Sequence, residues 1–240
     1  MRARAFAFLA RLSAASGGGR LAAWLRLAAY RVAGPRPSPE GPTDGAWCRY
    51  RPPPGVEEDA DTLLYFLHQA CGDAGSWGRL PLSRVFYARA KALGMRAPRV
   101  VGVSYGPLWS LLPTPGPEQP SLLERLVGDD LPRIEARVGV PRRRLLWGMS
   151  QGGFNAASLL LAHPGLFARA AVTCPAFYDF PIYSDEEARR FVARTGAVSE
   201  LAWWGLERLR PRVGGPEAWA REDPLVRAAD ARELPPTLVQ

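Results

Sequence analysis

The segment GMSQG, residues 148–152, has the composition of a turn that presents a reactive serine. An apolar run (143–149) leads into it, and apolar residues at helical spacing follow at once. In such a strand-to-helix turn the hydroxyl projects, and the helix N-terminus faces the negative charge that develops when serine attacks a carbonyl. The flanking glycines leave room for the turn. The sequence therefore predicts Ser150 as the nucleophile of acyl transfer, the alternative being a tight structural turn.

A second Gly-x-Ser-x-Gly pattern is centred on Ser104 and matches equally well in composition. Its context differs, because Pro107 follows and three more prolines stand within 113–117. Proline in a helix interior removes a hydrogen bond and clashes with the preceding turn, so no helix is expected here. Ser104 is predicted to lie at the end of a strand and not to be the nucleophile.

An acyl-transfer site also needs backbone N–H groups that hold the developing oxyanion. One comes from the residue after the serine, Gln151, and the second from the loop after an earlier strand. The segment YFLHQACGDAGSW, residues 65–77, ends a buried strand and is rich in small residues. We therefore predict Gln69 or Ala70 as the second donor.

The general base is the difficulty, because the sequence has only two histidines. His163 lies 13 residues after Ser150 on the same predicted helix, which is ~20 Å away, so it is interpreted as structural. His68 is expected to lie nearer to Ser150 than His163 does, but it is not the favoured base. Asp179 is an alternative acid without a histidine to orient. Asp73 and Asp223 are interpreted as loop and helix-start residues.

The elements that would position these residues alternate between strand and helix. Strands are predicted over 46–53, 62–70, 98–106, 143–149, 168–176 and 235–240, and helices over 81–93, 121–138 and 152–163. Ser121 and Glu124 form a capping box for the second helix. The pattern predicts an α/β fold with a doubly wound, mostly parallel sheet.

Residues 177–232 interrupt this alternation and are aromatic, with mixed, helical patterning. We interpret them as a cap insertion over an acyl pocket, the alternative being a subdomain that packs only its own core. The predicted pocket residues are Trp109, Phe177, Tyr178, Trp203 and Trp204.

Three blocks, residues 63–77, 96–109 and 145–177, together resemble the esterase family of the α/β-hydrolases, which groups bacterial carboxylesterases with relatives of S-formylglutathione hydrolase and feruloyl esterase. The resemblance covers 46–240. It implies that His68 orders the oxyanion loop, although Gln69 replaces the glycine that often follows. It also implies an acid after the strand at 235–240 and a histidine one strand later. Both are therefore expected beyond residue 240, and a C-terminal truncation is predicted.

The rest of the composition sets the context. The 240 residues are 47% hydrophobic, which suits one hydrolase domain over 46–240. Residues 1–45 are predicted to be a basic helical extension followed by a Pro/Gly linker. Three dispersed cysteines favour a reducing, cytoplasmic location, with membrane association or export through the N-terminal segment as the alternative. No cofactor and no metal is implied.

The net charge of +8 comes from dispersed arginines without a nucleic-acid-binding motif, so no nucleic-acid partner is predicted. Membrane contact through the N-terminal helix is not favoured. The sequence thus predicts a serine hydrolase that cleaves small-molecule carboxylic esters. The alternatives are a catalytically incomplete binding protein with this fold and an acyltransferase that uses the same serine.

Overall fold

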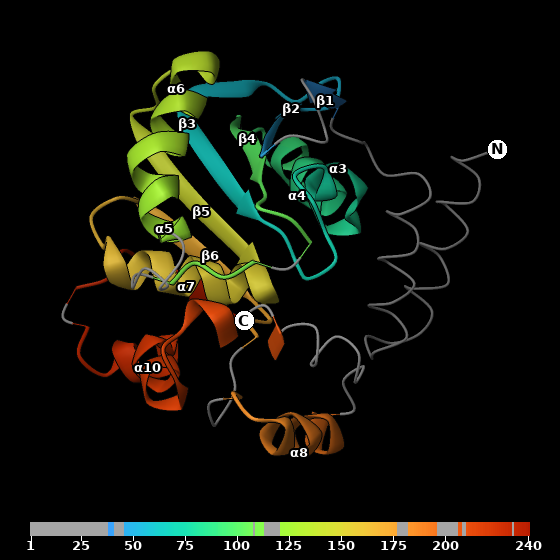
Figure 1. Cartoon of the computed structure of the whole chain (residues 1–240). Coiled ribbons are helices and arrows are strands. Elements are labelled where there is room, and N and C mark those ends of the chain that lie inside the picture. The colour runs from blue at the N-terminus through green and yellow to red at the C-terminus, as the bar shows by residue number, and fades with distance from the viewer. Residues whose placement is uncertain are drawn as a thin grey trace, which may run out of the picture.

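A seven-stranded sheet lies at the centre of the computed structural model, which describes residues 38–40, 46–107, 109–112, 121–176, 182–195, 206–207, 210–231 and 233–240 (Figure 1). Its strands are β1 (Ser38–Glu40), β2 (Trp47–Arg51), β3 (Glu58–Leu67), β4 (Ala97–Val103), β5 (Arg143–Met149), β6 (Arg169–Thr173) and β7 (Thr237–Val239). They follow the order β1-β2-β4-β3-β5-β6-β7. From β4 to β7 neighbours are parallel, while β1 and β2 are antiparallel at one edge. The predicted mostly parallel sheet is confirmed.

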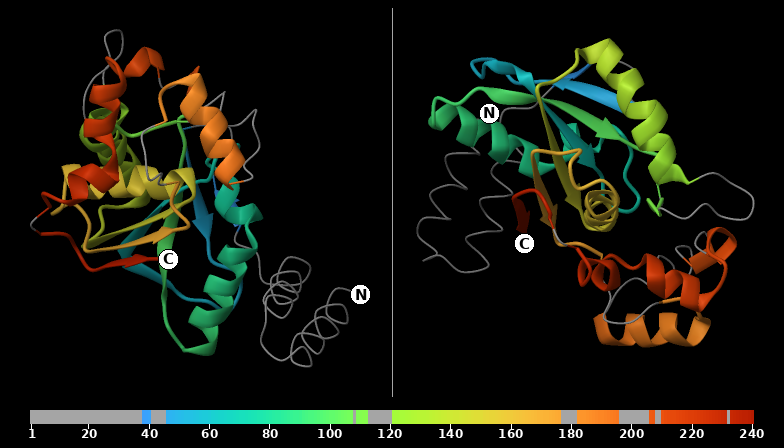
Figure 2. Two further views of the ribbon diagram at one scale, coloured as in Figure 1. Left: turned by 90° about the horizontal axis from the view of Figure 1, so that it is seen from below. Right: turned by 90° about the vertical axis from the view of Figure 1, so that its left-hand side faces the viewer.

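Helices cover both faces of this sheet (Figures 1 and 2). One face carries α3 (Ser76–Arg79) and α4 (Pro81–Ala92), and the other carries α5 (Leu122–Arg125), the π-helical turn η1 (Leu126–Asp130), α6 (Leu131–Val138) and α7 (Gln151–Ala162). The helix predicted over 121–138 is thus one run with a π-helical turn inside it. The hydroxyl of Ser121 accepts a hydrogen bond from the backbone N–H of Glu124, as the capping box predicts.

Strand β3 shows why the sheet is buried on both sides. Leu63, Tyr65 and Leu67 pack towards α5, α6 and α7, while Leu64 and Phe66 pack towards α3 and α4. Successive side chains of a strand point to opposite faces, so the apolar run Leu63 to Leu67 in this central strand is stable only between two helical layers. Because β3 lies between β4 and β5, the loop that follows it reaches the same sheet edge as the turn after β5.

The described part of the predicted cap is helical. It comprises α8 (Asp185–Thr195), the 3₁₀ turn η2 (Arg210–Arg212), α10 (Pro216–Glu222) and α11 (Pro224–Ala228), which lie on the α7 side of the molecule in Figure 1. Trp219 of α10 stacks on Phe154 of α7 with ring centroids 5.8 Å apart. This contact joins the insertion to the helix that follows the predicted nucleophile.

One element lies where a connector was predicted. Strand β1 falls inside the Pro/Gly-rich segment 34–45 and pairs with β2, with Pro39 opposite Tyr50. Proline is tolerated there because an edge strand leaves one side of its backbone unpaired. A strand thus precedes residue 46, the predicted start of the hydrolase domain. The remaining residues of 1–45 lie outside the described ranges, and within those ranges no helix is long and apolar enough to cross a membrane.

A buried carboxylate joins α6 to two strands of the sheet. The Tyr65 hydroxyl donates to Glu135 at 2.8 Å, and Arg144 donates to the two carboxylate oxygens at 2.6 and 2.8 Å. Burial by itself would raise the pKa of Glu135, but the hydrogen bonds from Arg144 and Tyr65 lower it overall. A lowered folded-state pKa gives stability that is present above the unfolded value of about 4.3 and is lost as the pH falls through the folded value.

Glu135→Gln is therefore expected to cost about 3 kcal/mol of unfolding free energy near neutral pH, because Arg144 loses its buried partner. The cost should shrink in acid, where the wild-type carboxylate also becomes neutral. Thermal unfolding of both proteins over an acid-to-neutral pH series measures this. Glu233→Gln, at an exposed position, serves as the control. A difference in stability that does not change with pH would contradict the assignment.

Candidate active site

The backbone of Ser150 is held in a strained turn between β5 and α7. Its φ is 55° and its ψ is −116°, a conformation that costs a residue with a side chain about 1–3 kcal/mol. The surrounding backbone fixes it: Ser150 N–H donates to the carbonyl of Thr173 at 2.9 Å, and its own carbonyl accepts from the backbone N–H of Ala176 at 3.0 Å. The strand-to-helix turn predicted around Ser150 is therefore present.

Two glycines of the motif are required by close backbone contacts. A Cβ at Gly148 would lie 2.0 Å from the carbonyl oxygen of Gly152. A Cβ at Gly152 would lie 2.0 Å from the carbonyl oxygen of Leu67 and 2.7 Å from that of His68. The second contact also brings the start of α7 directly against the end of β3.

The three predicted oxyanion donors lie at this junction. Gln151 is the first residue of α7, where an N–H group has no partner within its own helix. Gln69 and Ala70 follow β3, whose last residue, Leu67, is in register with Gly148. Within the described residues, no hydrogen-bond acceptor is found for the backbone N–H of Gln151, Gln69 or Ala70. All three are thus available for a ligand oxygen.

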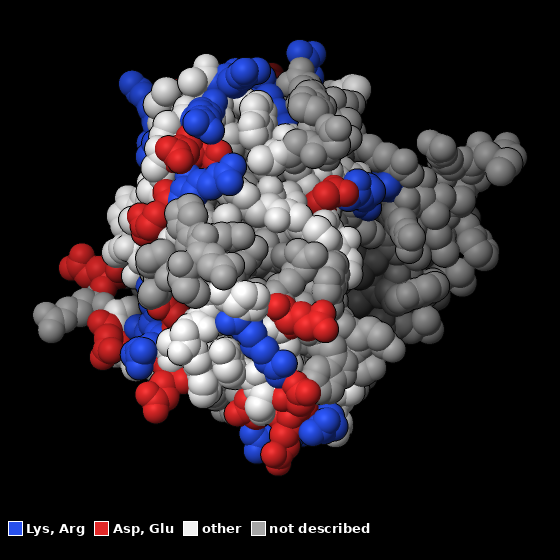
Figure 3. All heavy atoms as spheres, in the orientation of Figure 1, with Lys and Arg blue, Asp and Glu red and all other residues white. Residues whose placement is uncertain are grey.

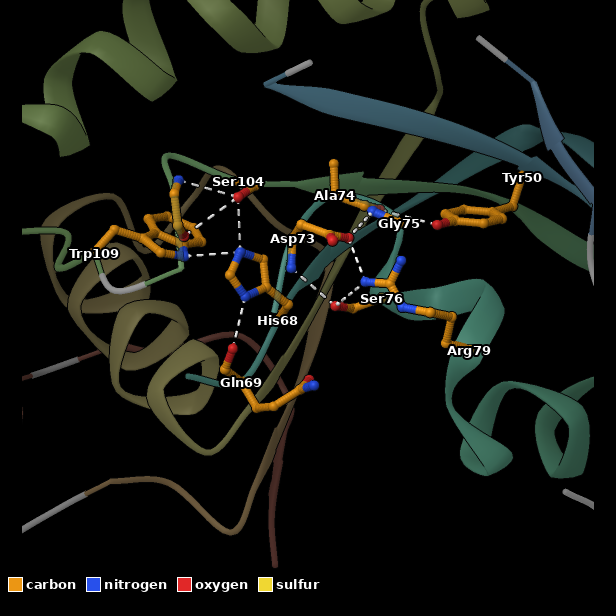
Figure 4. A network of polar contacts seen from close by, with 11 residues as sticks. Tyr50, His68, Gln69, Asp73, Ala74, Gly75, Ser76, Arg79, Ser104 and Trp109 are labelled. Atoms are coloured by element: carbon orange, nitrogen blue, oxygen red, sulfur yellow. Dashed lines mark hydrogen bonds and ion pairs between the residues drawn. The ribbon is translucent and has the colours of Figure 1, made fainter. Parts of the chain in front are cut away.

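Ser104 follows β4 directly, as predicted, and its surroundings differ from those of Ser150. Its hydroxyl oxygen lies 2.9 Å from Nε2 of His68 and accepts from the backbone N–H of Gly106 at 3.1 Å (Figure 4). Gly102 is required because a Cβ there would lie 2.2 Å from the carbonyl oxygen of Ala74. The second motif therefore serves loop packing, and no helix starts within residues 105–107 and 109–112, the described positions that follow it.

His68 is buried, with both ring nitrogens engaged (Figure 4). Nδ1 lies 2.7 Å from the carbonyl oxygen of Gln69, and Nε2 accepts from the indole N–H of Trp109 at 3.1 Å. A carbonyl only accepts and an indole only donates, so this network assigns the ring proton to Nδ1. Burial lowers the pKa of His68, which favours the same neutral ring. His68 is therefore committed to this network and not to Ser150.

His163 follows the last residue of α7, and its Nε2 lies 3.3 Å from Oε1 of Glu124. This is the structural role that its position predicts. Neither histidine of the sequence contacts Ser150, and no described side chain accepts a hydrogen bond from the Ser150 hydroxyl. The serine is presented without a base among the described residues.

Asp73 and Asp223 have the roles predicted for them. Asp73 accepts from the backbone N–H of Gly75 and pairs with Arg79 in the loop after β3. Asp223 caps α11 by accepting from the backbone N–H of Leu225. Asp179 lies outside the described residues. Among the residues described, no group of three or more His, Cys, Asp or Glu side chains could hold a metal ion.

Most of the predicted pocket residues lie outside the described part of the chain. Phe177, Tyr178, Trp203 and Trp204 lie outside the described ranges. Trp109 is described, and it is 2% exposed, so its ring is part of the core and not an open pocket wall.

Two polar side chains of α7 were missed by the sequence analysis. Gln151 Nε2 donates to the carbonyl of Trp109 at 2.7 Å, and Asn155 Nδ2 donates to the same carbonyl at 3.2 Å. The Asn155 amide oxygen accepts from the backbone N–H of Leu111 at 2.8 Å. An asparagine within the apolar part of the predicted helix was the available signal. These contacts fasten residues 109–111 to the helix that starts at the serine.

The sheet order and the strained strand-to-helix turn at Ser150 are those of the α/β-hydrolase class. A family model described as "Putative esterase" matches residues 67–238, which is more than half of the chain. The chain belongs to this esterase family. No curated protein sequence matches it.

Solved structures share the fold at low sequence identity. The chain is similar to an S-formylglutathione hydrolase from Agrobacterium tumefaciens, with 17% identity, 86% of this chain and 75% of that chain covered, and a TM-score of 0.51. It is similar to esterase B from Lactobacillus rhamnosis (16% identity, 83% and 62% covered, TM-score 0.51) and to a mutant of esterase E40 (22%, 99% and 76%, TM-score 0.51). The chain thus spans less than two thirds of the length of that esterase B.

Proposed function

We propose that this chain cleaves small-molecule carboxylic esters through an acyl-enzyme on Ser150. The observation that carries the proposal is the backbone of Ser150, at φ 55° and ψ −116°, directly before the unpartnered N–H of Gln151. The Ser150 oxygen attacks the ester carbonyl, and the alcohol leaves as the tetrahedral intermediate collapses. Water then attacks the acyl-enzyme, which releases the acid and restores the serine.

The oxyanion is bound by the N–H of Gln151 and by that of Gln69 or Ala70. These donors are fixed by α7 and by the loop after β3, so they need no reorganisation when the charge develops. Removing one such donor in a well-studied protease costs about 10² to 10³ in rate. The unpartnered state of these N–H groups supports their assignment to the oxyanion.

The proton of the Ser150 hydroxyl must pass to a base other than His68 or His163, because both rings have other partners. A serine hydroxyl is a weak nucleophile at neutral pH, so the unassisted reaction should be slow. Added imidazole can take the place of the base if it reaches the hydroxyl. Its effect on the rate therefore reports on Ser150 itself.

The test is release of p-nitrophenol from p-nitrophenyl butyrate at increasing imidazole concentrations. Imidazole cleaves this ester in buffer, so Ser150→Ala provides the background. We expect the wild-type chain to add an imidazole-dependent rate that saturates with ester concentration. A wild-type rate equal to that of Ser150→Ala at every imidazole concentration would refute the proposed activity.

The second candidate is a binding protein that keeps the hydrolase fold without turnover. The engagement of both histidines away from Ser150 is the observation that favours it. Saturable binding of the ester without imidazole-dependent cleavage would support this alternative.

A small-molecule partner is proposed in preference to nucleic acid. Figure 3 shows blue and red side chains interspersed over the described part of one face, without a continuous basic area there. Nucleic-acid binding would be expected to require clustered positive charge. A filter-binding assay with single- and double-stranded DNA and with RNA at low salt checks this, with no retention expected.

A further inference from the structure

Trp109 contacts both the helix that starts at the serine and the loop that carries the second oxyanion donor. Its carbonyl accepts from the side chains of Gln151 and Asn155, at 2.7 and 3.2 Å. Its indole N–H donates to Nε2 of His68 at 3.1 Å (Figure 4). One buried residue thus joins the two parts of the site through two different groups.

The contact continues from His68 to a single peptide group. Nδ1 of His68 lies 2.7 Å from the carbonyl oxygen of Gln69, which also accepts from the backbone N–H of Gly72 at 3.1 Å. In a trans peptide the carbonyl and the following N–H point in opposite directions, and the described residues contain no cis peptide bond. Holding the Gln69 carbonyl therefore directs the N–H of Ala70 away from the His68 ring.

We infer that Trp109 is a positioning residue that sets the distance between the N–H groups of Gln151 and Ala70, an inference that rests on the esterase function proposed above. On one side the Gln151 side chain fastens Trp109 to the residue that carries the first donor. On the other side, the hydrogen bonds from Trp109 to His68 and from His68 to Gln69 fix the peptide group that carries the second donor, the N–H of Ala70. Ala70, and not Gln69, is then the second donor.

Ser104 completes the environment of the ring. Its hydroxyl oxygen lies 2.9 Å from Nε2 of His68, on the same nitrogen that receives the indole N–H. A hydroxyl can donate or accept, whereas an indole can only donate. Trp109 is therefore the group that requires Nε2 to remain an acceptor, while the Gln69 carbonyl requires Nδ1 to carry the proton.

A purely structural role for Trp109 makes different predictions. The ring packs at an edge-to-face angle on Tyr105, with centroids 5.3 Å apart, so removing bulk there would lower stability whatever the indole N–H does. Trp109→Phe keeps an aromatic ring and removes the donor. If Trp109 only packs, this variant lowers stability but leaves the Nε2 resonance of His68, kcat and KM unchanged.

Trp77→Phe is the matched control. Trp77 is fully buried, and its indole N–H also meets a polar atom, the Tyr87 hydroxyl, at 3.4 Å. The control loses the same chemical group at a site that contacts neither His68 nor Gln151 through a hydrogen bond. It therefore reports the cost of a general loss of an indole from the core.

The experiment has two readouts on the full chain. The first is nitrogen NMR of His68, where we expect the Nδ1–H tautomer in all three proteins and a shifted Nε2 resonance, caused by loss of the indole donor, in Trp109→Phe alone. The second is imidazole-assisted cleavage of p-nitrophenyl butyrate. There Trp109→Phe should lower kcat about 10- to 100-fold with KM nearly unchanged, because the donors are displaced from the developing oxyanion.

Gln151→Leu tests the other contact and covers the case in which Trp109→Phe does not fold. It keeps the backbone N–H of Gln151 and removes the bond to the Trp109 carbonyl, so kcat should fall at least several-fold while His68 keeps its tautomer.

The outcomes separate this inference from the proposed function. An unchanged Nε2 resonance of His68 in Trp109→Phe overturns the inference, whether or not the chain cleaves esters. A changed Nε2 resonance with unchanged kcat overturns its catalytic half, as does a full-rate Gln151→Leu. If the wild-type chain has no imidazole-dependent activity above the background, the proposed function fails, and the catalytic half of the inference fails with it. The NMR measurement then still shows whether Trp109 donates a hydrogen bond to His68.

Discussion

Replacing Ser150 with alanine is expected to lower the imidazole-dependent part of ester cleavage to the rate of imidazole alone in buffer, and to leave the imidazole-independent part almost unchanged. In a triad enzyme, loss of the serine or of the histidine alone costs about as much as loss of all three members, and the residual ~10³ to 10⁴-fold acceleration comes from the oxyanion site and binding. Because neither histidine here contacts Ser150, the wild-type chain without imidazole resembles that residual state. The contribution of Ser150 to the cleavage rate should therefore be measurable only when imidazole is added.

Ser158→Ala is the control for this prediction. Ser158 lies on the same helix, is fully buried, and its hydroxyl makes no hydrogen bond with a described residue. Its replacement should preserve both parts of the rate and should not lower stability, since an unpaired polar group is removed from the core. Initial rates with and without imidazole, for the three proteins side by side, measure the effect. Equal imidazole-dependent rates in all three would mean that Ser150 does not react.

Gly152→Ala should be the most damaging single substitution for the fold of the site. The new Cβ would lie 2.0 Å from the carbonyl oxygen and 2.5 Å from the carbonyl carbon of Leu67, and 2.7 Å from the carbonyl oxygen of His68. All three atoms are backbone, so no side-chain rotation relieves the overlap. Either α7 moves away from β3 or the chain unfolds. We expect a loss of more than about 4 kcal/mol, the range reserved for severe core disruption.

Gly128→Ala is the matched control, because that glycine is also helical and nothing lies within 4 Å of a Cβ built on it. Alanine should stabilise the chain there by up to about 1 kcal/mol, since glycine loses more backbone entropy on folding. Urea unfolding followed by circular dichroism compares the two variants with the wild type. Gly152→Ala with wild-type stability would show that α7 and β3 are not in the close contact described.

The fold could be predicted because its signals are local. The uninterrupted apolar run of β3 indicates burial on both faces, and the alternation of strands with helices indicates a parallel sheet. The order of the strands and the pairing of β1 with β2 could not be predicted, because they depend on contacts between distant segments. Pro39 inside β1 also gave a signal for a connector, which edge pairing overrides.

The candidate site, too, could be predicted only where its signals are local in the sequence. The turn at Ser150 and the free N–H of Gln151 follow from five consecutive residues, so the motif predicts them. The role inferred for Trp109 depends on hydrogen bonds across 42 positions to Gln151 and 41 to His68, and a single sequence carries no signal for such a pairing. Trp109 was predicted only as a residue of the substrate pocket, whereas its N–H and carbonyl both have partners in the core.

The most direct test of the central claim is to locate the acyl group. The chain is mixed briefly with p-nitrophenyl butyrate and imidazole, quenched in acid, digested, and mapped by mass spectrometry. We predict a butyryl group on the peptide that contains Ser150, and its absence from that peptide in Ser150→Ala. A butyryl group on Ser104 or only on the exposed thiols of Cys71 and Cys174, or no adduct on any peptide, would contradict the assignment of Ser150 as the nucleophile.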